Sequence, residues 1–165
     1  MHWNLIHTKP RLEFSACQNL EQQGYEVYLP LIAREKLSKG HLTVVNEPLF
    51  PRYLFVKLTG KSESKGWSPI RSTRGVSRIV VFGSEPAKVD FTVVEKIKAF
   101  EQLQQASPNM YFSAGDKVCL TEGPFAGLEA VYQMSDGIKR AYVLIELLSK
   151  SVRLQVDLSK LRLAD

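Results

Sequence analysis

The side chains best suited to metal binding or nucleophilic chemistry are three histidines and two cysteines, and their spacing builds no reactive site. His2 and His7 lie five positions apart on or near one predicted strand, so they point to opposite faces and cannot hold one metal ion. His41 falls in a predicted turn. Cys17 and Cys119 are far apart and stand alone, which favours free thiols over a zinc site or a disulfide.

The sequence also lacks the local motifs of nucleotide-binding and hydrolytic enzymes. The stretch EGPFAG at 122–127 has no lysine and no helix start behind it, and a phosphate-binding loop requires both. No nucleophile elbow is present, and carboxylates such as Glu21 and Glu35 suit the surface of a helix and a hairpin. We therefore predict a binding protein that is not an enzyme and needs no metal or other cofactor.

Aromatic side chains in the stretch EPLFPRYLFV, residues 47–56, are better candidates for a functional surface. If residues 52–58 form a strand, successive side chains point to opposite faces. One face then carries Leu54, Val56 and Leu58, and the other carries Tyr53, Phe55 and Lys57. Two interpretations remain open here: the strand is buried on both faces, or its aromatic face binds a partner.

Basic residues are concentrated in the first two thirds of the chain. Residues 112–165 contain seven basic and seven acidic side chains, so the whole excess of five positive charges belongs to residues 1–111. Between positions 52 and 78 only Glu63 is acidic, whereas seven residues are basic: Arg52, Lys57, Lys61, Lys65, Arg71, Arg74 and Arg78. This distribution fits a polyanionic partner, and it fits ordinary solvated surface charge equally well.

Hydrophobic periodicity predicts the elements that position these residues. After a short strand over 3–8, a helix is expected with Thr8 as its cap, Pro10 in its first turn and Gly24 as its stop. Its buried stripe would consist of Leu12, Ala16 and Leu20.

Further along, strands are expected over 25–29 and 77–83, and a polar hairpin over 34–46 that turns at 38–40. A second helix is expected over 90–102, with an apolar face of Val94, Ile97 and either Phe100 or Leu103. These elements indicate an α+β domain over residues 1–103, a polar linker over 104–112 and a smaller C-terminal unit over 113–165. No apolar stretch approaches the roughly 20 residues of a membrane span. The N-terminus has no signal-peptide pattern, so we expect a cytoplasmic protein.

Two motifs in this order resemble the NusG family of transcription factors. The stretch GDKVCLTEGPFAGLEAVYQ at 115–133 resembles a KOW motif, and the front half, from Trp3 through FPRYLFV to the second helix, resembles the NusG N-terminal domain. EPLFPRYLFV and IRSTRGVSRIVVFG look closer to the specialised RfaH branch of that family. The resemblance implies an antiparallel sheet flanked by helices, followed by a small C-terminal domain.

The same resemblance implies two binding surfaces. The aromatic strand face would dock on the β′ clamp helices of RNA polymerase through Leu5, His7, Tyr53, Phe55 and Phe82. Non-template DNA would be contacted by Lys9, Arg11, Asn19, Arg71, Thr73 and Arg74. The first helix departs from the RfaH pattern at Ser15, Asn19 and Gln22, which are neither basic nor histidine. A different DNA element or weaker sequence specificity is therefore expected.

The C-terminal segment fits two structures. Its strand-like alternation suits the five-stranded barrel of the NusG family, whereas Ala141, Leu144, Ile145, Leu148 and Val152 form a helical stripe. Phe125, Leu128, Val131 and Tyr132 form a second one upstream. The RfaH resemblance implies a helical hairpin that masks the polymerase site in the resting chain and refolds into the barrel on release. Phe125, Leu128, Leu144, Ile145 and Leu148 would then pack between the domains, and Glu47 would pair with Arg140 as a latch.

The function expected on these grounds is transcription elongation and antitermination. The protein would be a monomer that binds RNA polymerase and non-template DNA, suppresses pausing, and contacts a protein of the small ribosomal subunit through its C-terminal domain. The alternative is an RNA- or ribosome-binding KOW protein with no role at the polymerase.

Overall fold

The computed structural model describes residues 2–58, 66–106, 131, 134 and 136–149. The strands are β1 (His2–Thr8), β2 (Glu26–Tyr28), β3 (Leu31–Ser38), β4 (His41–Pro48), β5 (Tyr53–Lys57), β6 (Val76–Ile79), β7 (Val81–Phe82), β8 (Glu85–Pro86) and β9 (Lys88–Asp90). The helices are α1 (Glu13–Gln22), α3 (Ser68–Arg71), α4 (Phe91–Ala106) and a further helical stretch over 137–149.

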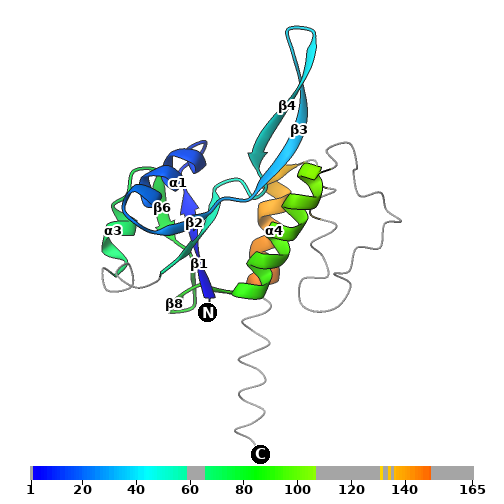
Figure 1. Ribbon diagram of the computed structural model, residues 1–165. Helices are drawn as coiled ribbons and strands as arrows, with labels where there is room; N and C mark the ends of the chain where they lie inside the picture. Colours follow the sequence, from blue (N-terminus) through cyan, green and yellow to red (C-terminus); the bar gives the residue numbers. More distant parts are fainter. Residues whose placement is uncertain (1, 59–65, 107–130, 132–133, 135, 150–165) are drawn as a thin grey trace, which may run out of the picture.

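A five-stranded antiparallel sheet forms the centre of the molecule. Its strand order is β2-β5-β1-β6, and β9 pairs with the N-terminal part of β1. α1 and α3 lie on one side of this sheet, while α4 and the 137–149 helix lie side by side on the other (Figure 1). The expected α+β architecture with an antiparallel sheet is confirmed for this part of the chain.

Strand β5 divides the core into two layers, as its alternation predicts. Leu54 and Val56 are fully buried on the side of α1, with Ala16 and Leu20. Phe55 is fully buried on the opposite side and belongs to the cluster that contains the apolar stripe of α4. The predicted α4 stripe of Val94, Ile97 and Phe100 is confirmed, since all three are buried there.

Helix α1 begins later than the sequence predicts. Thr8 is the last residue of β1 instead of the helix cap, because its amide donates to the carbonyl of Arg52, just before β5. The chain then turns through Arg11, at φ +64°, and Leu12 occupies the N-cap position without a side-chain cap. Leu12 was expected in the buried stripe of this helix but is 37% exposed. Glu13 is buried in its place.

The turn that follows α3 packs directly on α1. A Cβ at Gly75 would lie 3.1 Å from the Cβ of Ala16, and Gly75 has φ +97°. Both facts require glycine at this position, since a larger residue is strained in this conformation and meets helix backbone. The Asn19 side chain also donates to the carbonyl of Arg74 at 3.0 Å.

We expect Gly75→Ala to lower the free energy of unfolding by about 2–4 kcal/mol, because the left-handed backbone and the close approach both oppose a methyl group. Gly83→Ala is the matched control, since Gly83 has φ +71° and a Cβ added there would have no neighbouring atom within 4 Å. Its loss should be about 1 kcal/mol. Urea denaturation measures both values, and equal losses would show that the contact with Ala16 has no effect.

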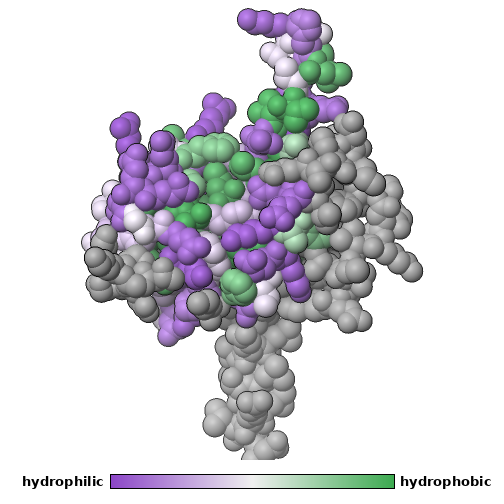
Figure 2. Space-filling model, in the orientation of Figure 1, coloured by the Kyte–Doolittle hydropathy of each residue, from purple (hydrophilic) through white to green (hydrophobic). Residues whose placement is uncertain are grey.

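Strands β3 and β4 form a hairpin that projects from the body of the protein (Figure 1). Its two-residue turn, Lys39 and Gly40, has positive φ at both positions, which is the geometry that suits a tight hairpin. Leu37 is 74% exposed and pairs with Leu42, so apolar side chains appear on the projecting arm in Figure 2. The turn predicted over 38–40 is confirmed.

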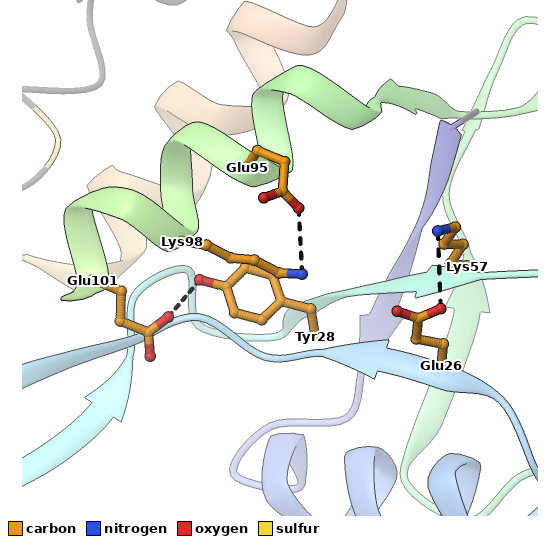
Figure 3. Close-up of polar contacts among 6 residues, drawn as sticks. All are labelled: Glu26, Tyr28, Lys57, Glu95, Lys98 and Glu101. Atoms are coloured by element: carbon orange, nitrogen blue, oxygen red, sulfur yellow. Dashed lines mark hydrogen bonds and ion pairs between the residues drawn. The ribbon is translucent and has the colours of Figure 1, made fainter. Parts of the chain in front are cut away.

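Polar contacts join helix α4 to the sheet (Figure 3). The hydroxyl of Tyr28 donates to the carboxylate of Glu101, and the Lys98 ammonium lies 5.2 Å from the ring centroid of Tyr28 and 5.1 Å from that of Trp3. Lys98 also pairs with Glu95 at 3.6 Å. α4 extends to Ala106 and therefore runs into the segment expected to be a linker from position 104.

Two sequence-based expectations concern membranes and thiols. Among the described helices, none combines the length and the hydrophobicity that crossing a membrane would require. Cys17 is a free thiol that donates to Glu21, and burial together with this carboxylate raises the pKa of the thiol to about 12. Cys119 lies outside the described residues.

Candidate functional site

The candidate site is an apolar surface on the sheet, hereafter the aromatic face, formed by Leu5, Tyr53, Phe55 and Phe82. In β1 and β5, Leu5 pairs with Phe55 and His7 pairs with Tyr53. Alternation therefore puts the side chains of these two pairs on one side of the sheet. Phe82 comes from β7, which pairs with β8 outside the main sheet, yet it packs against the same cluster.

The 137–149 helix covers the aromatic face. Its Ala141, Leu144 and Leu148 are buried in the cluster that contains Leu5 and Phe55, and Ile145 packs against the cluster from its edge. Leu5 and Phe55, which share this cluster with the buried residues of α4 as well, have no exposed surface, while Tyr53 and Phe82 keep part of theirs. This burial agrees with the helical alternative for Ala141, Leu144, Ile145 and Leu148. Val131 is also buried in the cluster, whereas Phe125, Leu128, Tyr132 and Val152 lie outside the described residues.

Arg140 anchors this helix to the chain just before β5. Its side chain is 1% exposed, and its Nε donates to the carbonyl of Leu49 at 2.7 Å. One terminal nitrogen donates to the carbonyl of Met134, also at 2.7 Å. The expected ion pair between Glu47 and Arg140 is not formed, since the carboxylate of Glu47 pairs with Lys36 at 2.7 Å. The charge of Glu47 nevertheless favours the charged form of Arg140 and opposes the lowering of its pKa.

A second arginine, from the base of the projecting hairpin, reaches the same carbonyl. Arg34 donates to Met134 at 2.6 Å, so two guanidinium groups converge on one oxygen. Burial lowers the pKa of Arg140, the neighbouring charge of Arg34 lowers it further, and Glu47 and Asp136 oppose both effects. The sequence gives no signal for Arg34, because its partner is a backbone atom 100 residues away.

His7 lies at the edge of the aromatic face, as a partly buried residue next to Tyr53. The two rings are tilted at 56° with their centroids 5.0 Å apart. Burial lowers the pKa of His7, and the charges of Arg52 and Arg78 lower it further. The imidazole is therefore mainly neutral at pH 7.

The residues expected to contact DNA fall into two groups. Lys9, Arg11, Arg71 and Arg74 are exposed around the first turn of α1 and the end of α3. The amide of Lys9 donates to the carbonyl of Gly75 at 2.9 Å, which joins these two segments.

The other two residues make internal contacts. The side chain of Asn19 donates a hydrogen bond to the carbonyl of Arg74, and Thr73 is only 6% exposed. The hydroxyl of Thr73 donates to the carbonyl of Pro69 at 2.7 Å and accepts a hydrogen bond from Gln23, also at 2.7 Å. These two residues thus orient the turn that presents Arg71 and Arg74.

Within the described part of the chain, no group of three or more histidine, cysteine or acidic side chains is arranged to bind a metal ion. The site consists of an apolar face, a helix that covers it and a neighbouring basic surface. Such an arrangement suits binding to a protein and to a polyanion.

Comparisons with known proteins agree on one family. A family model described as "Transcription termination factor nusG" matches residues 1–98. The "Transcription termination/antitermination protein NusG" of Thermus thermophilus is 25% identical over 178 residues, which covers 97% of either chain. The protein of the same description from Rickettsia bellii is 19% identical, over 99% of this chain and 90% of its own length.

Some relatives are considerably longer. The Streptomyces virginiae protein with the same description is 23% identical over 188 residues. The alignment covers 97% of this chain, and the chain spans only 62% of the length of that relative.

Proposed function

Since this chain belongs to the NusG family, we propose that it is a transcription elongation and antitermination factor that binds RNA polymerase through the aromatic face. The observation that carries the proposal is the position of Tyr53 and Phe55 beside Leu5 on one side of the sheet, under a helix from the far end of the chain. Aromatic side chains in an apolar patch are typical anchors of protein interfaces. The proposed partner segment is the pair of clamp helices of the polymerase β′ subunit.

The proposed regulation follows the RfaH branch of the family. In the resting chain the 137–149 helix occupies the aromatic face, so binding of this helix and binding of polymerase exclude each other. Arg140, with Glu47 nearby, acts as the latch that holds the helix. On release the C-terminal unit, proposed to begin near residue 113, refolds into a KOW-type barrel that contacts the small ribosomal subunit. Tyr142 and Ile138, which are 71% and 77% exposed on the helix, are compatible with a second structure that buries them.

The proposed activity requires both partners. The polymerase face would bring the protein to the elongation complex, and the basic surface would hold the non-template strand, so that pausing is suppressed. Lys9, Arg11, Arg71 and Arg74 are exposed and supply phosphate contacts, while Asn19 and Thr73 position the turn.

Replacing Arg71 and Arg74 with alanine should weaken binding to the exposed strand of an elongation complex. The slope of log K against log salt is negative, and each lost phosphate contact reduces its magnitude by about 0.7 on single-stranded DNA. The slope is measured by titration at several salt concentrations.

Lys88→Ala with Lys96→Ala removes the same charge from β9 and α4, and this control should leave the slope unchanged. An unchanged slope in the Arg71 and Arg74 double variant would mean that neither arginine contacts the DNA.

A titration of the full chain against RNA polymerase core and against isolated ribosomal subunits tests the function as a whole. Binding to polymerase that is weakened in a Tyr53→Ala variant supports the proposal. Binding to ribosomal subunits alone would instead identify a ribosome-binding KOW protein with no polymerase role.

A further inference from the structure

Three polar side chains lie close to the rim of the aromatic face, two of them on neighbouring strands and one in the turn before β5. His7 of β1 pairs with Tyr53 of β5 on one side and with Arg78 of β6 on the other. Directly paired residues of an antiparallel sheet point to the same face, so Arg78 lies on the side that carries Leu5 and Phe55. Arg52 precedes Tyr53 and completes the group, which we call the basic rim: His7, Arg52 and Arg78.

The backbone at one end of the basic rim is fixed in an uncommon conformation. Arg52 has φ +73°, and its Nε donates to the carbonyl of Thr8 at 3.2 Å. The amide of Thr8 in turn donates to the carbonyl of Arg52 at 2.8 Å. This pair of hydrogen bonds holds the Arg52 side chain beside β1, close enough for its charge to act on His7.

The charges of the basic rim have no acidic counterpart within the described part of the chain. The ion pairs found there join Lys36 to Glu47, Lys57 to Glu26 and Lys98 to Glu95, and none involves Arg52 or Arg78. The buried Nδ1 of His7 also lacks a hydrogen-bond partner among those residues. The guanidinium groups of Arg52 and Arg78 therefore lie without an acidic partner among the described residues, at the border of an apolar surface.

This combination favours the carboxylate of a protein partner over a nucleic acid phosphate. His7 and Arg78 lie on the same side of the sheet as the aromatic face, and a segment that buries Tyr53 approaches His7, whose ring is 5.0 Å away. Protein interfaces typically combine an apolar centre with a charged rim. Guanidinium groups bind carboxylates with matching geometry, and charge complementarity at a rim fixes orientation and accelerates association.

We propose that the basic rim receives an acidic side chain of the polymerase segment that docks on the aromatic face. This inference rests on the proposed function and adds the electrostatic part of recognition to it. It also gives polymerase an advantage over the covering helix, since the described residues of that helix form no ion pair with the rim. A partner that neutralises the rim gains an interaction that the covering helix does not make.

The test measures binding of full-length variants to RNA polymerase core without any nucleic acid. Arg78 is exposed on β6, so its substitution leaves the core intact. We expect Arg78→Gln to weaken binding about fivefold, and Arg78→Glu more, mainly through a slower association rate at low salt. Arg78→Lys should restore most of the rate. Lys88 is the matched control because it pairs with Asn4 and thus points to the opposite face of the same sheet. Lys88→Glu should change the affinity less than twofold.

Each outcome has a distinct meaning. If Arg78→Glu binds polymerase as tightly as the wild type, the basic rim makes no contact and the inference is overturned. A loss seen only on elongation complexes with exposed single-stranded DNA would also overturn it, since Arg78 would then be a phosphate contact. If the wild type itself does not bind polymerase, the proposed function fails together with the inference.

Discussion

Replacing both Tyr53 and Phe55 with alanine is expected to abolish binding to RNA polymerase. Each truncated aromatic anchor typically costs about 2 kcal/mol of binding free energy, so the pair should lower the affinity by two to three orders of magnitude. The same titration against polymerase core measures the effect. Phe55 is fully buried beneath the 137–149 helix, and its loss also reduces stability by about 3–5 kcal/mol.

Leu54→Ala separates the two effects. Leu54 is fully buried on the same strand but on the side of α1, so its truncation lowers stability without changing the aromatic face. The single variant Tyr53→Ala, at a partly buried position, should fold normally and still lose about 2 kcal/mol of binding. Polymerase binding that survives in the Tyr53 and Phe55 double variant would rule out the aromatic face as the docking surface.

Leu144→Asp is expected to release the covering helix and to raise the affinity for polymerase at least tenfold. Leu144 is 1% exposed in the cluster with Leu5 and Phe55, and an unpaired carboxylate in that position costs several kcal/mol. The docked helix must leave the aromatic face before polymerase binds, so its docking free energy reduces the free energy of polymerase binding. A variant whose helix is undocked should therefore bind polymerase more tightly. Circular dichroism on the same samples should show a loss of helix and a gain of β structure if the C-terminal unit refolds.

Tyr142→Asp is the matched control on the same helix. Tyr142 is 71% exposed, so a carboxylate there remains solvated and neither affinity nor the spectrum should change through undocking. Equal polymerase affinities for Leu144→Asp and the wild type would contradict autoinhibition, and the chain would then act as a NusG-like factor that is open throughout.

Local periodicity determined much of this molecule. The alternation of Leu54 and Phe55 predicted which layer each residue joins, because neighbouring residues of a strand must point to opposite faces. The α4 stripe and the hairpin turn at Lys39 and Gly40 were predicted for the same kind of reason. In each case the information lies within a few residues of the chain.

The start of α1 was decided by tertiary contacts. Thr8 suits a helix cap by residue type, but its amide completes a hydrogen bond with Arg52, 44 positions away. Thr73 likewise has the type and the basic neighbours of a DNA contact. Its burial against Gln23 follows from the close approach of α1 to Gly75.

The state of the C-terminal segment is the clearest case of tertiary control. The run around Leu144 satisfies both the helical and the strand pattern, so its sequence alone left the two structures open. The helix over 137–149 packs against an apolar surface, and Arg140 donates hydrogen bonds to the backbone carbonyls of Leu49 and Met134. A short isolated helix is marginal in water, and most of its stability comes from packing against another element. The helix over 137–149 therefore depends on the apolar surface against which it packs, and the fold of the preceding residues creates that surface.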